Sequence, residues 1–206
     1  MPDGLHDLIQ AIADRDDALV GRLLEQRPGL ATQSTGTGAT RAVSKPWFLK
    51  GLRYVYAGDT ALHVAAAAYR LDLVRTLLAL GADVGARNRR GVQPLHTAAE
   101  SAPGSPRWNP SAQAATIAGL IAAGADPNAQ TLEGATPLHR AVRTRGAAAV
   151  RALLEGGADP DRRNHHGSTP LKLAGLTTGR GGSGLLEARR EQAQIIELLQ
   201  KAGAAG

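Results

Sequence analysis

The sequence predicts an all-α solenoid in which short helix–turn–helix units stack side by side. One seven-residue motif occurs four times, as TALHVAA from Thr60, QPLHTAA from Gln93, TPLHRAV from Thr136 and TPLKLAG from Thr169. Each copy is followed by a variant of LLxxGAD, and the two clean units, 58–90 and 134–166, are 33 residues long. A fixed period of this length is typical of repeat proteins. Only 3% of the residues are aromatic, which suits closely packed helix pairs and argues against a large or enclosed ligand pocket.

Within each unit, the residues predict a turn, a first helix, a break and a second helix. Pro137 and Pro170 fit the first turn of a helix, and the threonine before each is a favourable N-cap. Apolar residues three and four positions apart give the second helix of the first unit one face to bury; they are Leu71, Val74, Leu77 and Leu78. Gly81 then predicts the end of that helix. One helix pair cannot bury this face alone, so neighbouring pairs must stack.

The motif at Thr136–Ala141 matches the pattern T-P-L-H-x-A, and together with the 33-residue period it resembles the ankyrin repeat. Three copies depart from the pattern, with Ala61 in place of proline, Gln93 in place of threonine and Lys172 in place of histidine. The resemblance implies a protein-interaction module with hairpin turns, and structural hydrogen bonds made by the threonines and histidines of the motif. These are Thr60, His63, His96, Thr136, His139 and Thr169. The abundance of Ala, Gly and Arg indicates a bacterial type of family member.

We expect a single ankyrin repeat domain over residues 1–206. Its predicted parts are an N-terminal capping helix pair at 1–31, an aromatic and basic insertion at 32–57, repeats at 58–90, 91–133 and 134–166, and a C-terminal capping repeat at 167–206. The second repeat contains an insertion at 101–110, and the last contains a glycine-rich insertion at 179–184. Both insertions are expected on the edge opposite the turn tips. Capping units are expected because the end of a stack has no neighbour to bury against.

The insertion at 32–57 holds four of the six aromatic residues, interleaved with basic ones. One interpretation is a contact loop in which Trp47, Phe48, Arg53 and Tyr54 anchor a partner, because aromatic and arginine side chains dominate interface energies. The alternative is that Trp47, Phe48, Leu49 and Leu52 fold back over the capping helices. The sequence leaves both open.

Charge and composition narrow the function classes. The net charge is +6, yet residues 1–30 contain six acidic residues against three arginines, so the remainder is strongly basic. The chain has no cysteine, which excludes disulfides and thiolate zinc sites. The N-terminus has no basic signal region, and no apolar run approaches the roughly 18 residues that span a bilayer. We therefore expect a cytoplasmic monomer that contacts no membrane.

No catalytic, metal or cofactor site is predicted. His63, His96 and His139 occupy equivalent repeat positions, so they should form a row rather than converge on one ion. Gly179–Gly184 lacks the Gly-Lys-Ser/Thr ending of a phosphate-binding loop and follows no strand. We expect no enzyme activity, because equivalent side chains in a row supply no convergent site.

The expected binding surface is the concave face, formed by the turn tips and the first helices. The predicted tips are Arg87–Arg90, Gln130–Glu133 and Arg162–His166, and Arg145 is expected to add charge beside the third repeat's first helix. The residues predicted to bind the partner here are Arg87, Arg89, Arg90, Arg140, Arg143, Arg162, Arg163 and His165. A basic groove of this kind favours an acidic protein partner, whose identity the fold does not specify. The alternative is a nucleic acid or another polyanion bound through its phosphates.

Overall fold

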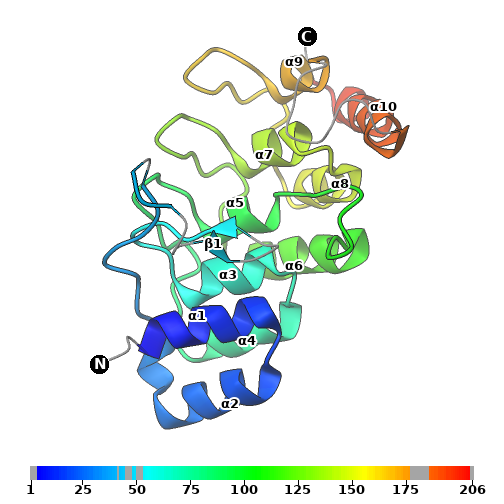
Figure 1. The fold of residues 1–206 in the computed structure, drawn as a ribbon. Coiled ribbons are helices and arrows are strands. Elements are labelled where there is room, and N and C mark those ends of the chain that lie inside the picture. Colours follow the sequence, from blue (N-terminus) through cyan, green and yellow to red (C-terminus); the bar gives the residue numbers. More distant parts are fainter. Residues whose placement is uncertain (1–3, 41, 45–47, 50–52, 177–185, 205–206) are drawn as a thin grey trace.

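The computed structural model describes residues 4–40, 42–44, 48–49, 53–176 and 186–204. In these residues ten α-helices follow one another in pairs (Figure 1). The pairs are α1 (Gly4–Asp14) with α2 (Asp17–Gln26), α3 (Ala61–Ala67) with α4 (Leu71–Ala79), α5 (Pro94–Ala98) with α6 (Pro110–Ala122), α7 (Pro137–Arg143) with α8 (Ala147–Glu155), and α9 (Pro170–Ala174) with α10 (Leu186–Lys201). A 3₁₀ turn (Pro28–Ala31) and two short strands, β1 (Phe48–Leu49) and β2 (Arg53–Tyr54), lie between the first two pairs. The predicted all-α solenoid is confirmed.

The helices form two layers along the stack. The first helices of the pairs contact one another in the order α1, α3, α5, α7 and α9, and in the second layer α4, α6, α8 and α10 do the same. One continuous apolar core runs between the layers, and three of the four leucines at the third position of the repeated motif, Leu62, Leu95 and Leu138, are fully buried in it. Burying this surface from water is the main stabilising contribution to such a stack.

The first helix of each full repeat begins where the sequence predicts. The side-chain oxygens of Thr60, Thr136 and Thr169 each accept the backbone N–H three residues on, which satisfies a helix donor that has no partner within the helix. Pro110 differs from expectation, because it begins α6 instead of ending a helix-free insertion. Asn109 caps that helix, and proline is well suited to its first position.

The turns that connect the repeats lie along one edge of the stack and bond to each other (Figure 1). The backbone N–H of Arg89 donates to Ala57 at 2.8 Å, that of Leu132 to Arg90 at 3.1 Å, and that of His165 to Glu133 at 3.1 Å. A side chain at Gly91 would meet the backbone N of Leu132 at 2.9 Å, and its φ of +69° also favours glycine. The turn tips are therefore a regular, closely stacked row.

The insertion before the first full repeat partly folds onto the stack. β1 and β2 pair antiparallel, with Phe48 opposite Tyr54, and the backbone N–H of Ala39 donates to Val55 at 2.7 Å. Leu49 and Val55 are buried in the common core. The apolar part of the insertion therefore covers helices, as one of the two interpretations expects.

The last pair is joined by a long connection. α9 ends at Ala174 and α10 begins at Leu186, and the glycine-rich stretch 179–184 between them lies outside the described residues. Ile195 and Leu199 of α10 are fully buried, so this helix closes the stack. Within the described part of the chain, no helix combines the length and apolar character needed to cross a membrane.

Candidate functional site

The histidines of the repeated motif tie each repeat to the next. His63 Nδ1 accepts the backbone N–H of Thr60, and His63 Nε2 lies 3.0 Å from the carbonyl oxygen of Val92 in the following repeat. His96 and His139 make the same pair of contacts, reaching the carbonyls of Ala135 and Ser168. Since a carbonyl only accepts, Nε2 must carry the proton and Nδ1 must be unprotonated. Each imidazole is thus a neutral bridge with both nitrogens engaged.

Burial keeps these histidines neutral. It lowers the pKa of His63 and of His139 below the ordinary value of 6.5. In His96, burial and then the positive charge of Arg140 lower the pKa to about 3. Among the residues the structure describes, no three His, Cys, Asp or Glu side chains gather as a metal site would require. The row of histidines therefore holds turns and helices in place and has no free nitrogen for a ligand.

A cavity of about 240 Å³ opens on the concave side of the stack. It is lined from the hairpin, the turn tips, the first helices and the loops that join helices within a pair. Six of its lining residues are arginines and two are glutamates: Arg15, Arg53, Arg90, Arg107, Arg140 and Arg143, with Glu100 and Glu133. We call this the concave cavity. Its lining has an excess of positive charge.

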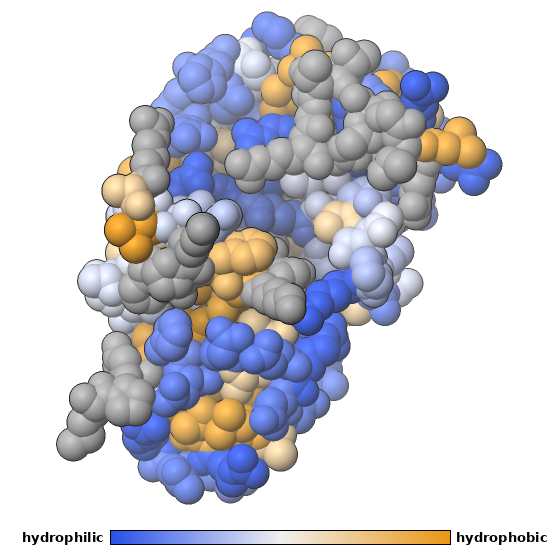
Figure 2. All heavy atoms as spheres, viewed as in Figure 1, coloured by the Kyte–Doolittle hydropathy of each residue, from blue (hydrophilic) through white to orange (hydrophobic). Residues whose placement is uncertain are grey.

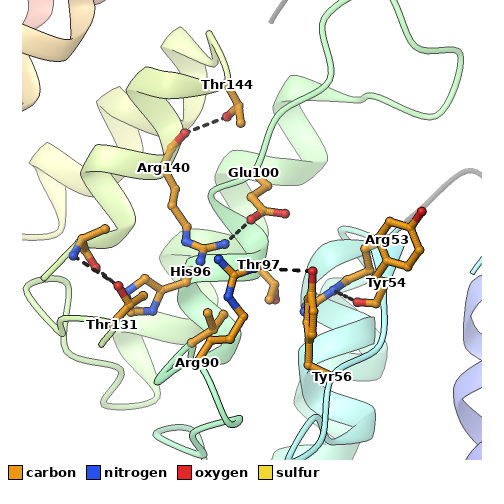
Figure 3. A network of polar contacts seen from close by, with 12 residues as sticks. Arg53, Tyr54, Tyr56, Arg90, His96, Thr97, Glu100, Thr131, Arg140 and Thr144 are labelled. Carbon is orange, nitrogen blue, oxygen red and sulfur yellow. Dashed lines mark hydrogen bonds and ion pairs between the residues drawn. The ribbon is translucent and has the colours of Figure 1, made fainter. Parts of the chain in front are cut away.

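Three arginines from distant parts of the chain meet in the concave cavity. Arg53 comes from β2, Arg90 from a turn tip and Arg140 from α7, and Figure 3 shows them directed toward a common region. The side chains of Arg53 and Arg140 are only 9% and 19% exposed. Burial lowers the pKa of Arg140, the carboxylate of Glu100 opposes that shift, and the charges of Arg53 and Arg90 add to it. Arg53 and Arg90 are thus each close enough to Arg140 to repel its charge.

Arg53 is held by a buried carboxylate. Its Nη2 donates to Asp59 Oδ2 at 3.1 Å, and its Nε donates to the carbonyl of Tyr54 at 3.1 Å. Asp59 is fully buried, and it also accepts the backbone N–H of Tyr56 and the side-chain amide of Asn88, each at 2.8 Å. Asp59 therefore ties the hairpin to the first turn tip. Arg53 Nη1 is buried and has no hydrogen-bond partner among the described residues.

Arg140 and Arg90 have partners within the cavity wall. Arg140 Nη1 donates to Glu100 Oε1, and Tyr69 donates its hydroxyl to the backbone carbonyl of Glu100. Arg90 Nη2 lies 3.8 Å from Glu133 Oε1, and the guanidinium carbon of Arg90 lies 5.2 Å from the ring centre of Tyr56. These contacts fix the guanidinium groups in place while leaving part of each open to the cavity.

The structure distributes the other predicted partner-binding arginines differently. Arg162, Arg163 and His165 are exposed at the last turn tip, and Arg143 is exposed at the cavity edge. Arg87 donates to the carbonyl of Gln130 and Arg89 to that of Ala39, so these two also brace neighbouring segments.

The expectation for Arg145 is wrong. Arg145 is 2% exposed and donates to the carbonyls of Ala174 and Leu176, so it joins α7 to the following repeat instead of charging the surface. Asn88 and Thr131, expected at exposed tips, are buried, because their side-chain oxygens accept backbone N–H groups that close the turns.

The apolar and aromatic residues of the insertion are divided between exposed and buried positions. Phe48 and Tyr54 are 47% and 40% exposed and pack on each other with ring centres 4.8 Å apart. Figure 2 shows hydrophobic atoms at the surface in the region of β1. The expected fold-back of Phe48 is therefore wrong, whereas Leu49 does fold back. Trp47 and Leu52 lie outside the described residues.

Several cavity residues were not predicted. The sequence prediction does not include Glu100, Arg107 or Trp108, although the loop that contains the last two emerges at the helix ends opposite the turn tips, as expected. Arg107 donates to the carbonyl of Ala13, so this loop crosses to the capping pair. The positions one and four after the motif histidine line the cavity in the second and third repeats, as Thr97, Glu100, Arg140 and Arg143. Comparing these positions across repeats would have identified Glu100.

Comparison with known protein families locates the repeats independently. Residues 57–89 match the family described as Ankyrin repeat, and residues 120–174 match the family described as Ankyrin repeats (many copies). Curated proteins gave no match to the chain. Ankyrin repeats generally mediate protein–protein interaction and are typically noncatalytic. With the repeated helix pairs, the stacked turns and the histidine bridges, these two matches identify the chain as an ankyrin repeat domain-containing protein.

Proposed function

We propose that the protein is a noncatalytic interaction module that binds an acidic segment of a partner protein on its concave face. The observation that carries this proposal is the excess of arginine over acidic residues in the concave cavity. Exposed arginines at the turn tips extend the same charge along the rim. A basic rim speeds encounter with an acidic partner, and paired hydrogen bonds from guanidinium groups give the complex its specificity.

The exposed aromatic pair supports the same surface. Phe48 and Tyr54 lie on the hairpin that also carries Arg53, so an apolar contact borders the basic cavity. Aromatic and arginine side chains are the residues that most often dominate binding energy at protein interfaces. In the proposal the domain spans the whole chain, and the partner-binding residues are Trp47, Phe48, Arg53, Tyr54, Arg87, Arg89, Arg90, Arg140, Arg143, Arg162, Arg163 and His165.

Charge reversal at the turn tips tests the proposal. Proteins captured from a lysate of the native source would be identified by mass spectrometry, and the capture repeated with the triple variant Arg87→Glu, Arg89→Glu and Arg162→Glu. The matched control reverses Arg22, Arg75 and Arg151, which are exposed on the outer helices α2, α4 and α8. We expect the tip variant to lose the partner and the control to keep it. Equal capture by both would contradict the proposal.

A polyanion remains the second candidate function because the same arginines could contact phosphates. The arginines are concentrated in a cavity that also contains Glu100 and Glu133, an arrangement that suits a carboxylate better than a run of phosphates. Oligonucleotide binding whose affinity falls steeply with salt would favour the polyanion instead. The proposal further takes the protein to act as a cytoplasmic monomer, which light scattering and fractionation of the native source would test.

A further inference from the structure

One donor in the concave cavity is buried without a partner. Arg53 is more than nine-tenths buried and lines the cavity, and two of its three guanidinium nitrogens bond to Asp59 and Tyr54. Its third nitrogen, Nη1, has no hydrogen-bond partner among the described residues. A buried charged donor without an acceptor destabilises the fold, so such a group indicates a missing acceptor.

The neighbours of Arg53 specify the charge of that acceptor. Arg90 and Arg140 reach the same region from the turn tip and from α7 (Figure 3), and Glu100 and Glu133 each engage only one of them. An additional negative charge placed among the three arginines would relieve their mutual repulsion and satisfy Nη1. The side chains of Arg53 and Arg140 are mostly buried and each is held by a carboxylate, so these two guanidinium groups are in place before any ligand arrives.

We propose that Arg53, Arg90 and Arg140 form a binding site for a single carboxylate, supplied by a glutamate or aspartate side chain of the partner's acidic segment. The inference deepens the proposed function and rests on it. In the complex, Arg53 Nη1 donates to one carboxylate oxygen, while Arg90 and Arg140 donate to the other. No covalent bond is made or broken.

Size argues against a drug-sized ligand, and charge favours a carboxylate over a phosphate. Pockets for drug-sized ligands span roughly 300–1,000 Å³. At about 240 Å³, and open to solvent on one side, the concave cavity is smaller than these pockets and has room for an inserted side chain. A phosphate group would bring up to two negative charges close to Glu100 and Glu133, whereas a carboxylate brings one.

The direct test is titration calorimetry with a hexaglutamate peptide whose C-terminus is amidated. Three variants alter the site: Arg53→Lys keeps a charge for Asp59 but removes the unpartnered nitrogen, and Arg90→Gln and Arg140→Gln each remove one guanidinium. The control is Arg75→Gln, which makes the same charge change on the outer helix α4, where Arg75 is 67% exposed. Thermal unfolding would establish that each variant is folded.

We expect each site variant to weaken peptide binding at least about tenfold, and the control to bind like the unaltered protein. Should Arg53→Lys fail to fold, the other two variants decide. Equal weakening by the control would overturn the inference, because it would show a response to net charge alone. Equally tight binding of hexaglutamine, free glutarate or inorganic phosphate would also overturn it.

The outcome separates this inference from the proposed function. If the unaltered protein fails to bind hexaglutamate while the turn-tip reversal still abolishes partner capture, the carboxylate site is wrong and the interaction module stands. If hexaglutamate binds and depends on the three arginines, the carboxylate site is supported whatever the turn-tip reversal does.

Discussion

The arginines of the concave cavity and those of the last turn tip differ in what surrounds them. Arg162 and Arg163 are exposed, and Arg163 contacts the carbonyl of Gly167 in its own turn. Arg53 and Arg140 are mostly buried against carboxylates from other segments. Exposed arginines attract a charged partner from a distance, whereas buried ones recognise a particular group because they are fixed and poorly screened. Under the proposed function, the tips would therefore govern encounter and the cavity recognition.

The comparison is tested most severely by removing Asp59. In Asp59→Ala, Arg53 is left buried without its carboxylate, and the side chain of Asn88 loses an acceptor. We expect the free energy of unfolding to fall by about 3–5 kcal/mol, the usual cost of breaking a buried ion pair. Urea unfolding measures it. Asp72→Ala is the control, since Asp72 is 99% exposed in its pair with Arg75, and a similar loss there would contradict the account.

The pH dependence of stability distinguishes the buried interior of the stack from the exposed turn tip. The pKa of His96 is about 3 in the folded protein against 6.5 unfolded, so below pH 6.5 the unfolded state binds more protons. The contribution is complete above pH 6.5 and is lost as the pH falls toward 3. Lowering the pH to about 5 should cost about 2 kcal/mol from His96 alone.

Urea unfolding over a pH series would measure this slope in the unaltered protein and in His96→Gln. We expect the slope to be reduced in that variant. His166→Gln is the control, because His166 is exposed at the turn tip and keeps its contact with water on folding. If His166→Gln reduced the slope and His96→Gln left it unchanged, the titrating group would lie at the turn tip, and the account would be contradicted.

A smaller effect is expected at the start of α7. Thr136 accepts the N–H of His139, and its hydroxyl lies 2.8 Å from His139 Nδ1. Thr136→Ala should cost about 1 kcal/mol in unfolding free energy. Thr169→Ala should cost less, because Lys172 stands where the histidine would be and α9 lacks the second half of the interaction. Equal losses in thermal or urea unfolding would mean that the histidine adds nothing to the cap.

The smallest effect is expected at the tip itself. Arg163→Ala removes an exposed side chain whose contact is within its own turn, so stability should change by less than about 0.5 kcal/mol. Differential scanning calorimetry is sensitive enough to measure this. A large loss would show that the tip is structural, and the division between encounter and recognition would fail.

Much of the fold could be predicted because the repeat carries it in short segments. Thr136, Pro137 and His139 specify a helix start within four residues, and the apolar spacing from Leu71 to Leu78 specifies the next helix. These signals act locally, so they can be recognised in the sequence without the tertiary structure. The row of turn tips, two of them rich in arginine, was likewise predictable from the order of the motifs.

The concave cavity was harder to predict because burial and pairing are properties of the assembled stack. The sequence suggests that Arg53 and Arg145 lie at the surface, yet both are largely buried. Asp59 pairs with Arg53, and a carbonyl of the last repeat accepts a hydrogen bond from Arg145. The loop that carries Arg107 reaches the cavity by crossing to Ala13. These two residues are far apart in the sequence, so no local pattern predicts their contact.

Arginine-detected NMR tests the central claim most directly. The Nε–Hε signals of Arg53, Arg90 and Arg140, and those of Arg162 and Arg163, would be assigned by substitution and followed as hexaglutamate is added. The account predicts that the three cavity signals shift together and saturate while the two tip signals change little. Shifts confined to Arg162 and Arg163, or no shifts at all, would contradict it.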